Sequence, residues 1–303
     1  MNVAVQKMQS LTGHSAPVYA LESGPAEGEF FSSAGDGMVV RWDMANPGQG
    51  HLVARLPHSV YAIHRPVDSN VLVCGHNYDG IHVLDWKEKK ELRSIQLTKA
   101  AIFDIKSAGD RLFVSDGEGS VTAVDLVNWS IIARLHHSDK SARAMAINPE
   151  TNELAVGYSD NKVRIVDLDS LALKYEWTAH GNSVFAVCYT PDMKSLVTGS
   201  RDARLKVWNA GSGYVEEREI VAHMYAINHV AFSPDGKHFV TCSLDKSIKV
   251  WETADFKLLK VIDKARHEGH GTSVNKLLWD GSERLISASD DKTISVWSVR
   301  FGH

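Results

Sequence analysis

LVTGSRDARLKVW at residues 196–208, FVTCSLDKSIKVW at 239–251 and LISASDDKTISVW at 285–297 superpose residue for residue. The same frame places FFSSAGDGMVVRW at 30–42, and weaker copies end at Leu84, Val124 and Val166. The residue after each tryptophan-equivalent position is 43, 85, 125, 167, 209, 252 and 298. Self-similarity at a period of about forty residues is the signature of a repeat architecture. Seven copies fill the 303 residues and leave no room for a second domain.

Each copy contains four short β-prone runs separated by turn residues. In the fifth copy these runs are 184–189, 195–200, 204–208 and 215–221, with turn signals at 190–193 and 201–203. A four-stranded sheet of this length cannot bury both of its faces alone, whereas seven sheets stacked around an axis bury each other. We therefore expect an all-β fold, a seven-bladed β-propeller with four antiparallel strands in each blade.

The repeat boundaries follow from the same spacing. We expect one domain over residues 1–303, with repeats at 11–50, 51–92, 93–133, 134–175, 176–219, 220–262 and 263–303. Only six residues follow Trp297, too few for an outer strand in the last blade, whereas residues 2–10 align with the outer strands of other copies. We expect residues 2–10 to supply that missing strand and close the ring, which removes an edge that invites aggregation.

Polar residues recur at fixed positions in several copies. A histidine before the first strand is followed by a serine, an aspartate and the tryptophan, and this pattern resembles the signature of WD-repeat (WD40) propellers. The matching residues are His180, Ser200, Asp202 and Trp208; His223, Ser243, Asp245 and Trp251; and His270, Ser289, Asp291 and Trp297. The first copy offers His14, Asp36 and Trp42, with Ala34 in place of the serine.

The resemblance implies that aspartate, histidine, serine and tryptophan form one hydrogen-bonded chain in each blade. A buried indole N–H and a buried imidazole need such partners. Because the set recurs, we interpret it as structural rather than as a catalytic triad. Copies two to four depart from it: His58 falls two residues late, and Thr98 and Ser138 replace the histidine. We expect the blades over residues 56–168 to depend more on apolar packing and to be looser.

One position on the innermost strand lies, by the same resemblance, at the mouth of the central channel. Its seven residues are Tyr19, Tyr61, Phe103, Arg143, Phe185, Asn228 and Asn275. Aromatic residues make up only 8% of the chain, so four at one position favour a binding surface for a partner, whose arginine or lysine would lie between the rings. The alternative is that these rings pack between blades. Tyr78, Arg201 and Tyr225 flank the same face as weaker candidates.

The remaining composition gives mostly exclusions. Net charge is −4 and no basic cluster stands out, so we expect no nucleic-acid partner. We find no signal peptide and no apolar run long enough to cross a bilayer. Cys74, Cys188 and Cys242 show no paired spacing, which favours free thiols and a cytoplasmic protein. His136-His137 and His267 to His270 lack the spacing of a zinc motif, so neither a metal nor a cofactor is expected.

Three functions fit these observations. The first is a non-catalytic interaction scaffold or adaptor, monomeric on its own and without an appended domain, that presents its channel mouth to a peptide or protein. The alternative is a propeller hydrolase, similar to lactonases, with a ligand or divalent ion at the channel. Asp104, His229 and Lys276 are its candidate residues, because other copies have alanine there. The third is a reader of nucleic acid or of a modified peptide.

Overall fold

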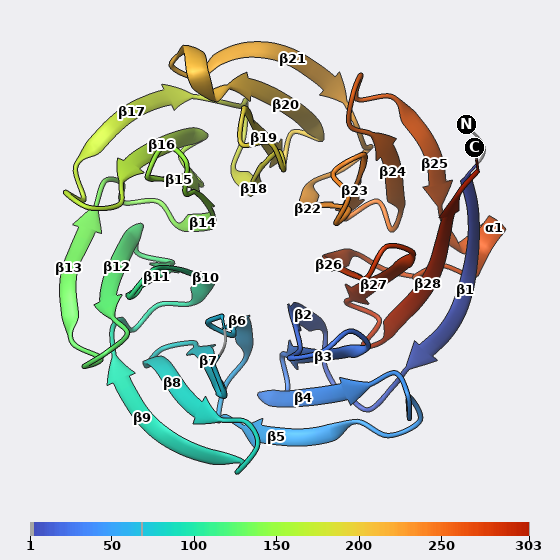
Figure 1. The fold of residues 1–303 in the computed structure, drawn as a ribbon, viewed down its shortest axis with the longest axis horizontal. Helices are drawn as coiled ribbons and strands as arrows, with labels where there is room; N and C mark the ends of the chain where they lie inside the picture. The colour runs from blue at the N-terminus through green and yellow to red at the C-terminus, as the bar shows by residue number, and fades with distance from the viewer. Residues whose placement is uncertain (1–2, 68, 303) are drawn as a thin grey trace.

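A computed structural model describes residues 3–67 and 69–302 of the chain. Seven four-stranded antiparallel sheets surround a common axis (Figure 1), which confirms the expected seven-bladed β-propeller. Helix is confined in the described ranges to one turn of α-helix, α1 (Lys264–His267), and a short 3-10 segment, η1 (Ala210–Ser212). The sequence repeats therefore correspond to sheets stacked side by side.

We number the blades 1 to 7 in the chain order of their innermost strands. In blades 1 to 6 the four strands are arranged outward from the axis in chain order, whereas in blade 7 the N-terminal strand takes the outermost place. The innermost strands are β2 (Val18–Ser23), β6 (Val60–His64), β10 (Ile102–Ala108), β14 (Ala142–Asn148), β18 (Val184–Tyr189), β22 (Ile227–Phe232) and β26 (Val274–Asp280). The second strands are β3 (Glu29–Ala34), β7 (Val71–His76), β11 (Arg111–Asp116), β15 (Glu153–Tyr158), β19 (Ser195–Ser200), β23 (His238–Ser243) and β27 (Arg284–Ser289).

The third strands are β4 (Met38–Asp43), β8 (Gly80–Asp85), β12 (Ser120–Asp125), β16 (Lys162–Asp167), β20 (Arg204–Asn209), β24 (Ile248–Glu252) and β28 (Ile294–Phe301). The outer strands are β5 (His51–Arg55), β9 (Lys90–Gln96), β13 (Ile131–His136), β17 (Leu173–Thr178), β21 (Val215–Val221), β25 (Leu258–Ile262) and β1 (Val3–Leu11). In Figure 1 the outer strands lie along the periphery of the ring.

Burial follows the position of a strand in its blade. All six residues of β15 and β23 are buried, because these strands lie between two neighbouring sheets. Most residues of the outer strands β9 and β21 are exposed. Each apolar cluster combines residues from two adjacent blades, as where Val240 and Val250 of blade 6 pack with Leu285 and Trp297 of blade 7. The hydrophobic effect therefore stabilises the ring through the contacts between blades.

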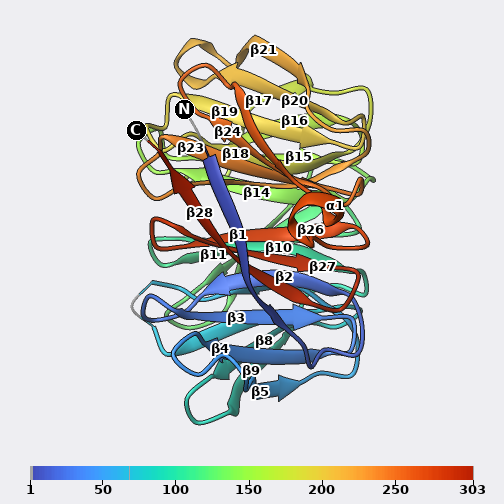
Figure 2. The same ribbon diagram turned by 90° about the vertical axis from the view of Figure 1, so that its right-hand side faces the viewer.

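The N-terminal segment completes the last blade, as expected. Strand β1 pairs antiparallel with β28, so that Val3 lies opposite Phe301 and Leu11 opposite Ile294. In Figure 2, β1 runs along the side of the ring next to β28. The expected closing segment comprises residues 2–10, of which Asn2 lies outside the described residues. The first and last strands of the chain, β1 and β28, thus lie side by side in one sheet.

The expected repeat boundaries differ from the blades themselves. Boundaries after residues 92, 133, 175 and 219 fall inside the outer strands β9, β13, β17 and β21, and the one after residue 50 falls just before β5. The outer strands are the most variable and most polar parts of each copy. The apolar pattern that predicts the repeat boundaries is therefore weak at the ends of the outer strands.

Candidate functional site: the channel mouth

The seven predicted mouth residues share one backbone feature. In every blade the register between the first and second strands shifts across that position, as between Val184 and Ala186 around Phe185. The other shifts enclose Tyr19, Tyr61, Phe103, Arg143, Asn228 and Asn275. A β-bulge leaves its extra residue outside the regular pairing and redirects the side chain. All seven side chains line the central cavity, whose volume is about 1080 Å³.

Three of these side chains form a continuous aromatic arc. Tyr19 meets Tyr61 edge to face with centroids 4.6 Å apart, and Tyr61 is stacked parallel to Phe103 at 6.0 Å. Each ring is half-buried, so it contacts its neighbours and also faces the cavity. Packing between blades thus accounts for part of each ring of the arc, and the rest of its surface is open to the cavity.

Arg143 lies between Phe103, the last ring of the arc, and Phe185. Its guanidinium carbon lies 3.8 Å from the Phe103 centroid and 4.7 Å from the Phe185 centroid. Burial lowers the pKa of Arg143 to about 10, so the side chain remains a cation at neutral pH. Among residues 3–67 and 69–302, no acceptor forms a hydrogen bond or ion pair with it. The space between these two rings is therefore filled by a cation of the chain itself.

The two asparagines of the mouth link neighbouring blades. Asn228 of blade 6 donates to Ser273 Oγ at 2.9 Å and to the Val274 carbonyl at 2.8 Å. Asn275 of blade 7 donates to the Val18 carbonyl at 3.0 Å and to Asp290 at 2.8 Å. Their amides are used within the ring, which places them in a structural role next to the aromatic arc.

Asp104, His229 and Lys276 lie one residue beyond the mouth position. Asp104 accepts a hydrogen bond from the Met145 amide of blade 4 at 2.8 Å and pairs with Lys106 at 3.4 Å. His229 accepts from the Leu277 amide at 3.4 Å, and burial holds its pKa well below the ordinary range. Burial also lowers the pKa of Lys276. Two of the three residues the hydrolase alternative relies on thus accept backbone hydrogen bonds from a neighbouring blade.

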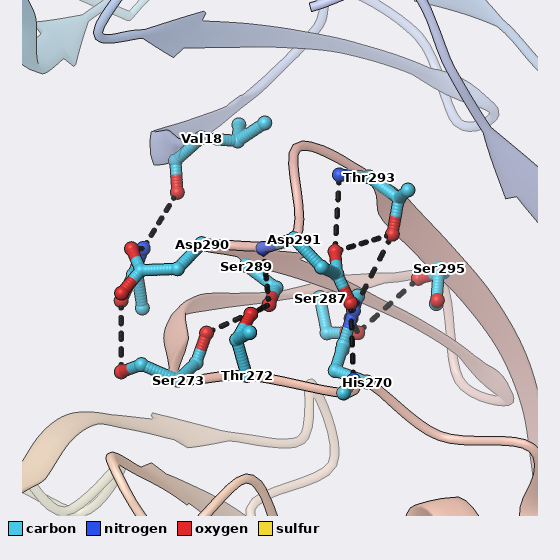
Figure 3. Close-up of polar contacts among 12 residues, drawn as sticks. Val18, His270, Thr272, Ser273, Ser287, Ser289, Asp290, Asp291, Thr293 and Ser295 are labelled. Carbon is cyan, nitrogen blue, oxygen red and sulfur yellow. Dashed lines mark hydrogen bonds and ion pairs between the residues drawn. The ribbon is translucent and has the colours of Figure 1, made fainter. Parts of the chain in front are cut away.

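The hydrogen-bonded chains of blades 1, 5, 6 and 7 use a different hydroxyl from the expected one. In blade 5, His180 Nδ1 lies 3.1 Å from Asp202, and its Nε2 lies 2.8 Å from Thr198 Oγ1, which accepts from Trp208 Nε1 at 2.9 Å. Figure 3 shows the equivalent arrangement in blade 7, where His270 lies between Asp291 and Ser287. The bridging hydroxyls are Ser32, Thr198, Thr241 and Ser287.

The serines expected in these chains serve a neighbouring purpose. Ser200 donates to the Asn182 carbonyl at 3.1 Å, Ser243 to the Tyr225 carbonyl at 3.2 Å and Ser289 to the Ser273 carbonyl at 2.7 Å. They hold the incoming loop against the turn. Side chains alternate along a strand, so residues two apart share one face and sequence alone does not distinguish them. Ala34 therefore removes nothing from the chain of blade 1, which Ser32 completes.

Blades 2 to 4 have polar contacts of their own at the same turns. In blade 4, Ser138 donates to Asp160 at 2.8 Å, and buried Arg164 pairs with Asp160 at 2.8 Å and with Glu176 at 2.6 Å. In blade 3, Thr98 donates to Glu118 at 3.2 Å. The expectation that these blades depend mainly on apolar packing is thus wrong for their turns, because other residue types replace the missing histidine.

Exposed side chains surround the mouth. Tyr78 is 62% exposed and Tyr225 is 58% exposed, and Arg201 is exposed as well. Blade 6 adds Met224, 81% exposed, and Leu244, 50% exposed. The Leu244 amide bonds to the Ala226 carbonyl, so these residues lie at the end of blade 6 where its inner strand begins. Sequence reasoning missed Met224 and Leu244 because single apolar residues in turns are common.

Two further observations concern metals and membranes. Within the described ranges, one group of three metal-ligating side chains lies close enough to share an ion, and it belongs to blade 2 rather than to the channel: His76, Asp79 and His82. Neither helical segment of the described chain has the length and apolar character that crossing a bilayer requires.

Seven four-stranded sheets closed by the N-terminal strand, with recurring Asp–His–hydroxyl–Trp chains, define a β-propeller of the repeat class. The family described as WD domain, G-beta repeat matches residues 5–43, 172–209, 215–252 and 262–298, together half of the chain. The chain belongs to the WD-repeat family.

Similarity to individual proteins is weaker. The chain is 24% identical over 212 residues to Meiotic fizzy-related protein 1 of Schizosaccharomyces pombe, covering 68% of this chain and 50% of that protein. It is 24% identical over 165 residues to THO complex subunit 6 homolog of Danio rerio, covering 46% and 49%. It is 34% identical over 93 residues to Periodic tryptophan protein 2 homolog of Mus musculus, covering 30% and 10%. The chain thus spans half or less of the length of these relatives.

Proposed function

We propose that this propeller is a non-catalytic interaction platform, and that its channel mouth binds a segment of a partner protein through an acidic group. One observation carries the proposal: Arg143 lies between Phe103 and Phe185, and no described residue supplies an acceptor for its guanidinium. A partly desolvated guanidinium gains most from a carboxylate, which it can bind with two parallel hydrogen bonds. The aromatic rings hold the cation in place.

The surroundings of the mouth support a protein partner. Rigid aromatic rings contribute much contact area with few rotatable bonds, and interface hot spots are rich in tyrosine and arginine. Met224, Tyr225 and Leu244 of blade 6 add exposed apolar surface at the same end of the ring. The name of the Danio rerio relative describes a subunit of a complex, which agrees with a role in assembly.

The acidic group proposed here is opposite in charge to the arginine or lysine of a partner that the sequence led us to expect. A partner's arginine or lysine between the rings would have to displace Arg143 from contacts of 3.8 and 4.7 Å. Two like charges would then share a slot of low polarity, which is unfavourable. An acidic side chain or a C-terminal carboxylate needs no such displacement.

We also propose that the chain is not an enzyme, is monomeric alone and is cytoplasmic. Asp104 and His229 accept hydrogen bonds from backbone amides of adjacent blades, which supports a structural role for them. Closure of the last blade within one chain supports a monomer, and three free cysteines agree with a reducing compartment. Light scattering coupled to gel filtration tests the monomer, and imaging of the tagged protein tests the location.

The experiment that tests the platform is a comparative pull-down from lysate of the source cell. The bait is the wild type, the double variant Phe103→Ala/Phe185→Ala, or Leu173→Ala, an exposed control on the outer strand of blade 4. Proteins recovered with the wild type and the control but lost with the double variant support binding at the mouth. Equal recovery with all three baits overturns it.

The charge of the partner is tested on peptides from the protein recovered. Arg143→Met keeps an unbranched apolar stem and removes the charge, and we expect at least tenfold weaker peptide binding, measured by fluorescence anisotropy. Replacing acidic residues of the peptide by their amides should weaken wild-type binding equally. Loss of binding on replacing the peptide's arginine or lysine, with its acidic residues dispensable, contradicts the acidic-group proposal and leaves the platform intact.

A further inference from the structure

Blade 2 carries a histidine cluster at the turn where blades 1, 5, 6 and 7 carry the Asp–His–hydroxyl–Trp chain. Its residues equivalent to Thr198, Asp202 and Trp208 are Cys74, Tyr78 and Leu84, so none of that chain is retained. Instead His76 ends β7, His82 lies in β8, and Asp79 lies in the turn between them. Both histidines are buried, at 4% and 8% exposure.

Three ligand atoms of this cluster form a nearly equilateral triangle. His76 Nδ1 lies 3.1 Å from His82 Nε2 and 3.6 Å from Asp79 Oδ2, and His82 Nε2 lies 3.5 Å from the same oxygen. Zinc–ligand bonds of about 2.0–2.1 Å in a tetrahedron put neighbouring ligand atoms roughly 3.3 Å apart. We propose that His76, Asp79 and His82 bind a zinc ion in the turn of blade 2.

The next layer of contacts has the form that a zinc site requires. His82 Nδ1 lies 2.8 Å from Glu91 Oε1 of the outer strand β9. A carboxylate on the second ring nitrogen holds a ligating histidine in the correct tautomer and orientation, and such partners accompany most histidine ligands. Glu91 thus directs the Nε2 lone pair of His82 toward His76 and Asp79.

The side of the triangle away from the sheet is open. The Asp79 side chain is 39% exposed, while the two imidazoles are covered. Water can therefore reach the ion as a fourth ligand. The site ties the β7–β8 turn together and through Glu91 reaches β9. The ion thus takes over in blade 2 the structural role that the hydrogen-bonded chain has in blades 1, 5, 6 and 7.

Zinc binding has one specific consequence for a neighbouring backbone group. Without metal, the His58 amide donates to His76 Nε2 at 3.2 Å, so the proton of His76 lies on Nδ1, directed at His82. With zinc on Nδ1, that proton must move to Nε2, where it opposes the His58 amide. The hydrogen bond from His58 is therefore lost when zinc binds, and the segment before β6 shifts.

The site escaped sequence reasoning because its spacing belongs to a hairpin rather than to a helix. His76 and His82 are six residues apart, and the sheet register places Cys74 rather than His76 opposite His82. Only the turn geometry brings the two ring nitrogens to 3.1 Å. The expectation of no metal site rested on other histidines, His136-His137 and His267 to His270.

The experiment is zinc titration of the whole chain after dialysis against chelator. We expect one equivalent of zinc to bind by calorimetry and elemental analysis, to raise Tm, and to shift the NMR signal of the His58 amide. Cobalt(II) in place of zinc should give the visible absorption of a tetrahedral site. Asp79→Asn and His82→Gln should lose the bound equivalent, and Glu91→Gln should bind zinc about 10–100-fold more weakly.

The control is His136→Gln, which removes another histidine paired with an aspartate, at 3.1 Å from Asp139. It should bind zinc as the wild type does. The Asp79 side chain is 39% exposed, so its variant tests the site even where His82→Gln does not fold. No stoichiometric zinc in the wild type, or full binding retained by Asp79→Asn, overturns the proposal. These outcomes do not bear on the channel mouth, which lies outside the cluster.

Discussion

Lys7 of β1 is the register partner of Trp297 in β28, and its ammonium lies 5.7 Å from the centre of the indole ring. The pair joins the first strand of the chain to the last at the seam of the ring. The same strand inserts Val3 and Leu11 into two different apolar clusters, one on each side of blade 7. Closure therefore connects blade 7 to both of its neighbours.

Deletion of residues 1–10 should destabilise the ring severely. The deletion removes the outer strand of blade 7 and exposes the edge of β28, and full burial of an apolar side chain such as Val3 contributes about 1.5–3 kcal/mol by itself. We expect the free energy of unfolding to fall by more than about 3 kcal/mol, measured by urea denaturation. Met8→Ala, on an exposed side chain of the same strand, is the control. An unchanged unfolding curve for the deletion contradicts closure by β1.

Thr198→Val should reduce stability because it removes the bridging hydroxyl. Thr198→Ser keeps that hydroxyl and its hydrogen bonds. Valine leaves the buried Trp208 indole N–H and His180 Nε2 without their shared partner, which costs about 1–3 kcal/mol. Serine keeps the hydroxyl and loses only a methyl group. The two variants are compared by thermal and urea unfolding. If both lose the same stability, packing of the methyl rather than the hydroxyl bridge explains the effect.

Asn275→Ala should weaken the junction between blades 7 and 1. It leaves the Val18 carbonyl and Asp290 without the amide that joins them, at a cost of about 1–3 kcal/mol. Met224→Ala, at an exposed side chain of blade 6, should change stability little. Hydrogen exchange of the β2 and β26 amides reports where the loss occurs. Wild-type stability in Asn275→Ala would mean that this amide serves the surface rather than the junction.

Stability should fall in two stages as pH is lowered. Burial lowers the pKa of His14 and of His223, so below about pH 6.5 the unfolded chain takes up protons that the folded chain does not, and stability declines. Burial opposes ionisation of Asp202, but hydrogen bonds from His180 and from backbone amides outweigh it and lower the pKa of Asp202 to about 2. Its contribution is present above about pH 4 and is lost as pH falls toward 2.

Urea midpoints at pH 7.5, 5.5 and 3.5 measure this decline. His14→Gln removes one of the histidines and should flatten the slope between pH 6.5 and 5 while it lowers stability at neutral pH. Midpoints that stay constant from pH 7.5 to 5.5 contradict the first stage, because they would mean that the folded and unfolded chains bind the same number of protons over this range.

The number of blades, the four strands of each and the closing role of the N-terminal segment can all be predicted from the amino-acid pattern alone. These features are predictable because the alternation of apolar residues and the turn residues recur at the same positions in each copy, as in the stretch from Leu196 to Trp208. The repeat in the sequence also identified the seven mouth positions, from Tyr19 to Asn275. The bulge there depends on local strand pairing, which every repeat shares.

The contacts of those side chains follow from the folded arrangement of the blades and could not be predicted from the repeat. Arg143, Phe103 and Phe185 come from three blades, and no local pattern shows that the arginine fills the slot between the rings. The choice of Thr198 over Ser200 as the bridging hydroxyl, and the meeting of His76 with His82 across a turn, likewise depend on distances between side chains. Strand periodicity specifies the face on which a residue lies, whereas the packing of neighbouring sheets specifies its partner.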